Sequence, residues 1–163
     1  ILVNINPAYR THELAYALNQ SGCRALVASP NFKTSDYVVM VDAVRPECSS
    51  LEHVIFFWSD AWDALCDEAN AASEDDLEAR QRELSPGDPI NVQYTSGTTG
   101  NPKGSILTHS NLITTQLMTS AVTGARGEDT YMIMTPIAHR VGMSRLVTCF
   151  SLGATVVVMP PAV

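Results

Sequence analysis

The chain has 163 residues, of which 45% are hydrophobic, so it is long enough to bury a substantial core. Its net charge of −7, with acid concentrated between Asp60 and Glu83, excludes the basic stripe that a nucleic-acid binder needs. The cysteines and histidines are scattered without metal-ligand or disulfide-framework spacing, so we expect a reducing, cytoplasmic compartment. No apolar run reaches the ~18 residues that a membrane span requires.

The first half of the chain alternates β-branched runs with helical patterns, which is typical of an α/β sheet with crossover helices. A helix is expected to have Thr11 as its N-cap and to end at Gly22. The segment 35–44 has strand composition, yet we predict a helix, because parallel strands on either side need a crossover. The acidic segment 61–84 is predicted to be helical, with a break near Ala72 and a solvated charged face. Strands are predicted at residues 1–5, 24–28 and 53–58.

The second half continues this alternation on both sides of a loop rich in serine, threonine and glycine. We expect Ser110 or Asn111 to cap a helix that runs to about Val122. A loop over residues 136–142 is expected to precede a helix over residues 143–152. Strands are predicted at residues 90–94, 104–108, 131–135 and 154–159.

The strongest internal boundary falls at Gly124, so we predict a first α/β subdomain at residues 1–124 and the start of a second at residues 125–163. The chain begins directly as a strand without a methionine and stops just after another strand. We therefore expect a fragment that is truncated at both ends. The fold class predicted is α/β, with a mixed, largely parallel sheet and flanking helices.

The loop that follows the strand at residues 90–94 has the composition of a polyphosphate cradle. Its glycines let the backbone take positive φ and approach a ligand closely, and successive amides in such a turn form a nest for phosphate oxygens. Lys103 adds a charge that binds phosphate. The Walker, Rossmann and nucleophile-elbow patterns do not match, and the alternative is an exposed linker. The predicted phosphate-binding residues are Thr95, Ser96, Gly97, Thr98, Thr99, Gly100 and Lys103.

The run Thr-Ser-Gly-Thr-Thr-Gly-Asn-Pro-Lys-Gly at residues 95–104 resembles the signature of the adenylate-forming superfamily, which includes acyl-CoA synthetases, luciferases and adenylation domains. Residues 4–10 resemble the segment upstream of this loop in fatty-acyl-CoA synthetases. Residues 136–142 resemble the next motif, Pro-x-aromatic-His-x-x-Gly, although Ala138 stands where relatives usually carry an aromatic residue. The resemblance covers essentially the whole chain and implies a partial N-terminal domain of the acyl-CoA synthetase type.

The resemblance implies an AMP-forming acid–thiol ligase that activates a carboxylate, with a fatty acid favoured, and transfers it to coenzyme A. ATP, Mg²⁺, coenzyme A, a small carboxylate and the remainder of the polypeptide are the expected partners. The loop would hold the β- and γ-phosphates with Lys103, Mg²⁺ would touch Thr95, and His139 would line the acyl pocket; Lys103 and His139 are the predicted catalytic residues. The fragment alone is expected to be inactive, because the family's Tyr-Gly-x-Thr-Glu segment and C-terminal catalytic lysine are absent.

Several alternatives stay open. The chain is an acyl-CoA ligase fragment, a non-catalytic ATP/AMP-binding module, or a structural remnant of the same fold, and the acceptor thiol is coenzyme A or a carrier protein. His139 lines a pocket or is a solvated loop residue beside Arg140. Gly142 allows close packing or an unusual backbone angle, or is an ordinary loop glycine. Met143 and Phe150 are expected in the core.

Overall fold

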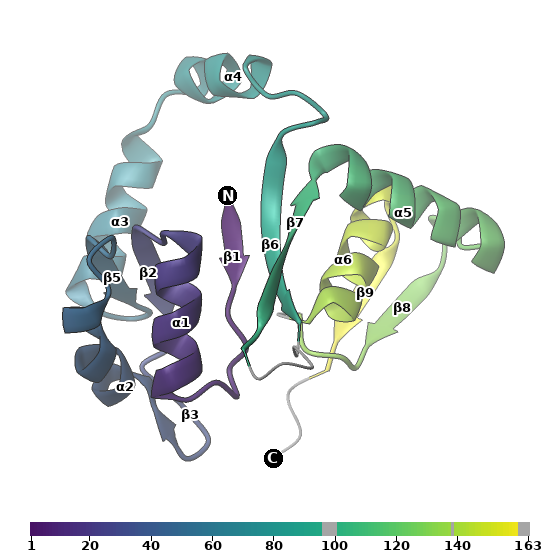
Figure 1. The fold of residues 1–163 in the computed structure, drawn as a ribbon. Helices are drawn as coiled ribbons and strands as arrows, with labels where there is room; N and C mark the ends of the chain where they lie inside the picture. The colour runs from purple at the N-terminus through teal and green to yellow at the C-terminus, as the bar shows by residue number, and fades with distance from the viewer. Residues whose placement is uncertain (96–100, 138, 160–163) are drawn as a thin grey trace. The chain divides into compact units, whose positions relative to one another are not determined.

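The computed structural model describes residues 1–95, 101–137 and 139–159, which form alternating strands and helices (Figure 1). These residues gather in two units. The β6 unit comprises the described residues of Ile1–Asn6, Pro86–Ser96 and Lys103–Val163, and the α1 unit comprises those of Pro7–Ser85 and Gly97–Pro102. The α/β class is confirmed, with the described strands paired in four small sheets. The lobe boundary predicted at residue 124 concerns the longer polypeptide and stays a prediction.

The α1 unit is built from short strands and the helices that connect them. Strand β2 pairs with β5 in parallel, and the helix predicted over residues 35–44 lies between them in the chain, as a parallel crossover requires. A small antiparallel hairpin that the sequence did not predict joins β3 to β4. The elements of this unit are α1 (Thr11–Ser21), β2 (Ala25–Ala28), β3 (Asn31–Phe32), β4 (Ser35–Asp36), α2 (Tyr37–Val44), the 3-10 helix η1 (Arg45–Glu47), β5 (His53–Phe56), α3 (Asp60–Ala71) and α4 (Glu74–Arg82).

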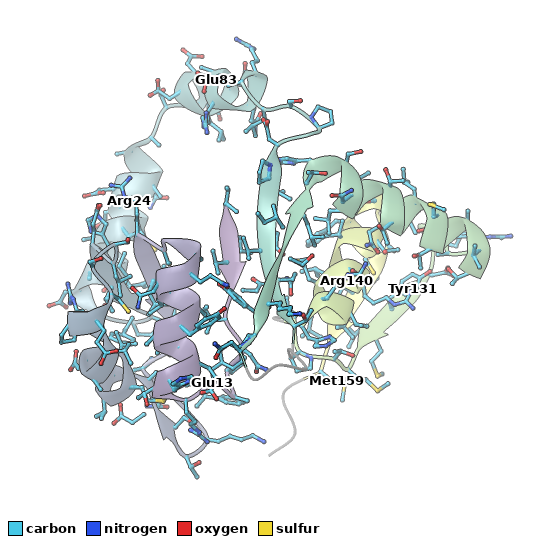
Figure 2. All side chains as sticks on the ribbon, in the orientation of Figure 1. Glu13, Arg24, Glu83, Tyr131, Arg140 and Met159 are labelled. Atoms are coloured by element: carbon cyan, nitrogen blue, oxygen red, sulfur yellow. The ribbon has the colours of Figure 1, made fainter. Side chains whose placement is uncertain are left out.

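Helix α1 begins one residue earlier than its predicted cap. Arg10 is the N-cap, its backbone N–H donates to the carboxylate of Glu13 at 3.1 Å, and Gly22 ends the helix in the left-handed region with φ 61°. Hydrogen bonds from the backbone N–H groups of Glu13 and Arg10 to this carboxylate hold the pKa of Glu13 below its usual value. Glu13 is labelled in Figure 2. The prediction of Thr11 as the cap was therefore wrong by one position.

The core of the α1 unit is apolar. Leu14, Ala17 and Leu18 recur at helical spacing on α1 and are buried, whereas Ala15 is half-buried. The acidic segment splits into α3 and α4 at Ala72, as predicted, and neither helix has a buried residue. The remaining buried apolar residues of this unit are Leu26, Val41, Val44, Cys48 and Leu51.

The β6 unit has one mixed sheet and one parallel pair. Strand β6 pairs in parallel with β1 and antiparallel with β7, so the β1 strand joins a partner almost ninety positions later in the chain. Strands β8 and β9 pair with each other in parallel. Helix α6 lies between them in the chain and forms their crossover (Figure 1). The elements are β1 (Leu2–Asn4), β6 (Pro89–Thr95), β7 (Lys103–Thr108), α5 (His109–Thr123), β8 (Thr130–Ile133), α6 (Arg140–Leu152) and β9 (Thr155–Val158).

The starts of α5 and α6 both correct the sequence prediction. The hydroxyl of Thr108, the last residue of β7, accepts from the backbone N–H of Asn111 at 3.1 Å, and the Asn111 side chain accepts in return from the N–H of Thr108 at 3.2 Å. Thr108 is therefore the N-cap, where Ser110 or Asn111 had been predicted. Helix α6 begins at Arg140, so residues 140–142 are helical rather than part of the predicted loop.

The interior of the β6 unit holds polar side chains alongside apolar ones. Ile133, Met143 and Cys149 are buried, and so are five polar residues, namely Asn91, Gln93, Gln116, Ser120 and Thr148. The Thr148 hydroxyl lies 2.8 Å from Oε1 of Gln116, which joins α6 to α5. Within the described ranges, no helix combines the length and the apolar character that crossing a bilayer requires.

Candidate active site

The β6–β7 hairpin sets the frame of the predicted phosphate-binding loop. Its antiparallel register places Thr95 directly opposite Lys103, so the two ends of the loop lie side by side. The Thr95 hydroxyl donates to the carbonyl oxygen of Lys103 over 3.4 Å, which closes the base of the loop. Directly opposed residues of an antiparallel pair project from the same face, with Cβ atoms about 5 Å apart. A hydroxyl and an ammonium group therefore leave the sheet together at the loop.

Gly104 serves packing rather than backbone freedom. The sequence suggested that the glycines of this segment take positive φ. Gly104 is not among the glycines with positive φ. A Cβ atom at this position would lie 3.1 Å from Cγ1 of Val92 and 3.4 Å from the ring of Tyr94. The missing side chain therefore leaves room for the half-buried tyrosine at the end of β6.

Alternation along β6 identifies the face on which Thr95 and Lys103 lie. Asn91, Gln93 and Thr95 share one face, since side chains two residues apart in a strand point the same way. Asn91 and Gln93 are buried there, and Nε2 of Gln93 lies 3.6 Å from Sδ of Met143 on α6. Helix α6 thus packs on the face of the sheet from which Thr95 and Lys103 project.

His139 is the N-cap of α6, one turn before Met143. Its Nδ1 accepts a hydrogen bond from the backbone N–H of Val141 at 3.2 Å. A neutral imidazole with an accepting Nδ1 carries its proton on Nε2, so an exposed Nε2–H donor faces away from the helix end. His139 lies one helical turn, about 6 Å, before Met143. Thr95 lies two strand residues, also between about 6 and 7 Å, after Gln93. The Gln93–Met143 contact therefore links the neighbourhoods of both predicted site residues.

Gly142 allows close packing in the first turn of α6. A Cβ atom there would come within 2.8 Å of the Thr135 carbonyl oxygen and would overlap the Pro136 carbonyl oxygen. Gly142 is not among the residues with positive φ, so of the two roles predicted for it, close packing is the one observed. The segment before His139 thus lies directly against the helix that His139 caps.

Three further predictions concern neighbouring side chains. Met143 is buried, as expected of a core residue, whereas Phe150 is 72% exposed, so its prediction as core was wrong. Residues Thr148 and Cys149 face the neighbouring elements, and the 100° step of a helix turns Phe150 away from them. Arg140 is exposed in the first turn of α6, beside His139 (Figure 2).

Two titratable side chains of the β6 unit, Cys149 and Tyr131, have raised pKa values. Burial raises the pKa of the Cys149 thiol, which disfavours the reactive thiolate. Burial and the neighbouring Asp129 raise the pKa of Tyr131, whose hydroxyl lies 3.2 Å from Oδ2 of Asp129 (Figure 2).

The remaining site predictions lie outside the described residues. Ser96, Gly97, Thr98, Thr99 and Gly100 belong to this group, as does Ala138. Among the residues that are described, no three of the types His, Cys, Asp and Glu gather to hold a metal ion. The exposed hydroxyl of Thr95 is a hard oxygen of the kind that Mg²⁺ accepts alongside substrate phosphates, so it fits a magnesium held mainly by nucleotide. The assignment of every predicted site residue stays a prediction.

The fold and the hairpin define an α/β domain that presents a loop rich in glycine, serine and threonine between two paired strands. Comparison with known families gives the class: residues 1–163 match the family described as AMP-binding enzyme. The chain belongs to this family, whose members use ATP and coenzyme A.

The relatives are acyl-CoA ligases. The human medium-chain acyl-CoA ligase ACSF2, a mitochondrial protein, is 34% identical over 99% of this chain. Among solved structures, a long-chain-fatty-acid-CoA ligase (FadD1) from Archaeoglobus fulgidus is 27% identical, with a TM-score of 0.76 over 96% of this chain and 29% of its own. The N-terminal domain of FACL13 from Mycobacterium tuberculosis has a TM-score of 0.80 at 23% identity, covering 99% of this chain and 38% of its own, and shows the same fold.

The chain spans about a third of the curated relatives that it matches, 30% of the length of human ACSF2. The matched region lies in the N-terminal domain. Sequence motifs predicted the loop, Lys103 and His139 as site residues, which stays a prediction, but they did not predict that His139 caps α6 or that Gly104 makes room for packing. A histidine ring is outside the usual set of N-cap residues, and a glycine next to a lysine gives no sign of the tyrosine that it accommodates.

Proposed function

We propose that the complete polypeptide activates a carboxylic acid, with a fatty acid favoured, as an acyl adenylate and transfers the acyl group to coenzyme A. The observation that carries the proposal is the hairpin register, which sets Thr95 opposite Lys103 at the two ends of the loop. A loop whose two ends are joined in this way would offer amides and hydroxyls to a polyanion from a fixed base. The acyl-CoA ligases among the relatives support the same reaction.

In the first half-reaction a carboxylate oxygen attacks the α-phosphorus of ATP. The new bond joins the acyl group to AMP, and the bond to the β-phosphate breaks, so that pyrophosphate leaves with its electron pair. Lys103 and the loop bind the β- and γ-phosphates and stabilise the charge of the leaving group. This contribution is positioning and electrostatics, because an anion has to approach a polyanion.

Mg²⁺, when bound, neutralises phosphate charge. Thr95, at the start of the loop, would contribute its hydroxyl oxygen as a ligand. His139 donates from Nε2–H toward the carboxylate or acyl oxygen. In the second half-reaction the sulfur of coenzyme A attacks the acyl carbon, its thiol proton is released, and AMP leaves.

The test is a panel of carboxylates assayed with the full-length protein by AMP release in the presence of ATP, Mg²⁺ and coenzyme A. We expect turnover with fatty acids of some chain length. If no carboxylate releases AMP, then the ligase proposal is wrong, and calorimetric titration with ATP·Mg²⁺ separates a nucleotide-binding module from a structural remnant. Replacing coenzyme A by a carrier-protein thiol in the same assay identifies the acceptor.

The 163-residue chain alone is proposed to be inactive, since it spans only 30% of the length of human ACSF2. ATP–pyrophosphate exchange on the isolated chain is expected to give no turnover. Native-like exchange by this chain would contradict that expectation.

We also propose a cytoplasmic location, which subcellular fractionation tests.

A further inference from the structure

Two side-chain amides converge on the sulfur of Met143. Nε2 of Gln93 lies 3.6 Å from Sδ, and Nδ2 of Asn4 lies 3.8 Å from the same atom. Gln93 is 4% exposed and Met143 is 9% exposed, so the contact is buried. A thioether is a weak but polarisable acceptor, and it is the only polar atom that a methionine side chain offers.

The convergence follows from the sheet. Strands β1 and β6 are parallel and place Asn4 beside Gln93, so the two amides leave the same face as neighbours. A buried amide N–H without an acceptor is unfavourable, and an aliphatic side chain at position 143 would provide none. The two donors therefore favour the observed position of the Met143 side chain against the sheet.

Met143 is tied to His139 through the backbone. The N–H of Met143 donates to the carbonyl oxygen of His139 at 3.1 Å, and the N–H of His139 donates to the carbonyl oxygen of Pro136 at 2.9 Å. With Gly142 packed against the residue 135–136 carbonyls, the capping turn has little freedom to shift independently of Met143. A displacement of Met143 would move the His139 ring.

We propose that Met143 is a positioning residue for the carboxylate substrate: held by Asn4 and Gln93, it fixes the His139 turn on the face of the strand that leads into the phosphate-binding loop. This inference rests on the proposed function, because it assigns His139 to the acyl side of that site. It adds a specific consequence. Disturbing the sulfur contact should weaken carboxylate binding and leave ATP binding, which depends on the loop itself, nearly unchanged.

The experiment uses the full-length enzyme with Met143→Leu, which keeps the volume and removes the acceptor, and with Gln93→Leu, which removes a donor. Each variant is expected to raise KM for the carboxylate by about five- to tenfold and to change KM for ATP by less than about twofold. The double variant is expected to be no worse than the poorer single variant, because both changes remove the same contact.

Thr148→Val is the matched control, since it removes a buried polar contact on the same helix but one that faces α5. It is expected to lower the thermal midpoint and to leave the carboxylate KM unchanged. Met143→Leu and Gln93→Leu variants with a wild-type carboxylate KM, or with an equal rise in both KM values, would overturn the inference while the ligase function stands. If the wild-type enzyme turns over no carboxylate, then the proposed function fails and this inference fails with it.

Discussion

The two units of the molecule use polar side chains in opposite ways. In the described β6 unit, five polar side chains are buried, from Asn91 to Thr148. In the described α1 unit no polar side chain is buried, and the polar contacts are made by exposed or half-buried groups, such as the exposed Arg24–Glu52 ion pair at 2.7 Å and the half-buried Ser59 hydroxyl. Arg24 and Glu83, which both take part in exposed pairs of the α1 unit, are labelled in Figure 2.

This difference in burial indicates in which unit the positions of polar side chains are held most firmly. A buried polar group is costly without its partner, so a buried contact tolerates little displacement. An exposed ion pair exchanges readily with water and contributes little. Thr95, Lys103 and His139, three of the predicted site residues, belong to the unit with the buried contacts. The predictions that follow test this contrast, beginning with the largest effect.

Gly142→Ala is expected to destabilise the protein most, by about 3 kcal/mol, because the new Cβ would collide with the backbone of residues 135 and 136. The control is Gly153→Ala, a position with φ 70° and open space around the added atom, for which about 1 kcal/mol is expected. Urea denaturation measures both. Equal losses would show that the first turn of α6 is not tightly packed.

Thr148→Val is expected to cost about 2 kcal/mol, because it leaves Oε1 of the buried Gln116 without its donor. The double variant with Gln116→Leu removes both partners and should be closer to the wild type than the two single losses added together. A double-mutant cycle by urea denaturation measures the coupling. Additive losses would mean that the α5–α6 contact is not a coupled hydrogen bond.

Helix caps should cost the same in both units, since they are local and both capping residues are half-buried. Thr108→Ala in the β6 unit and Ser59→Ala in the α1 unit each remove a side-chain acceptor at a helix start, and each should lose about 1 kcal/mol. Urea midpoints of the two variants measure the effect. A much larger loss for Thr108→Ala would extend the contrast between the units to their surfaces.

The smallest effect is expected for Glu52→Gln in the α1 unit. The hydrogen bond from Arg24 lowers the pKa of Glu52, so its contribution is present above the ordinary carboxyl pKa and is lost as pH falls through the lowered folded value. The wild type and the variant should therefore differ slightly at neutral pH and converge in acid. Urea midpoints at neutral and at acidic pH measure the difference between the two proteins. A difference that grows in acid would contradict the expected pH dependence.

The elements that were predictable from sequence are those with local signals. The strands that flank the loop follow from their β-branched runs, whereas the register that sets Thr95 opposite Lys103 comes from the structure. The break at Ala72 and the helical reading of residues 35–44 also follow from local composition and from the need for a crossover. The motif at residues 136–142 predicted His139 as a site residue, and that assignment stays a prediction.

The rest depends on contacts that a local pattern does not contain. The pairing of β1 with β6 joins distant segments, so nothing near Asn4 predicts Gln93 as its neighbour. The cap of α5 depends on how far β7 extends, and Thr108 ends that strand and starts the helix. The β3–β4 turn passes through Lys33 at φ 55°, a residue that does not signal a tight turn.

The central claim is that Lys103, opposite Thr95 at the end of the loop, binds the phosphates of ATP. The direct measurement is adenylation by the full-length enzyme carrying Lys103→Ala, with Lys33→Ala, the other lysine of the sequence and an exposed one, as the matched control. Lys103→Ala should lower kcat/KM for ATP by about 10- to 100-fold, and Lys33→Ala should leave it unchanged. Wild-type kcat/KM in the Lys103→Ala enzyme would contradict the claim.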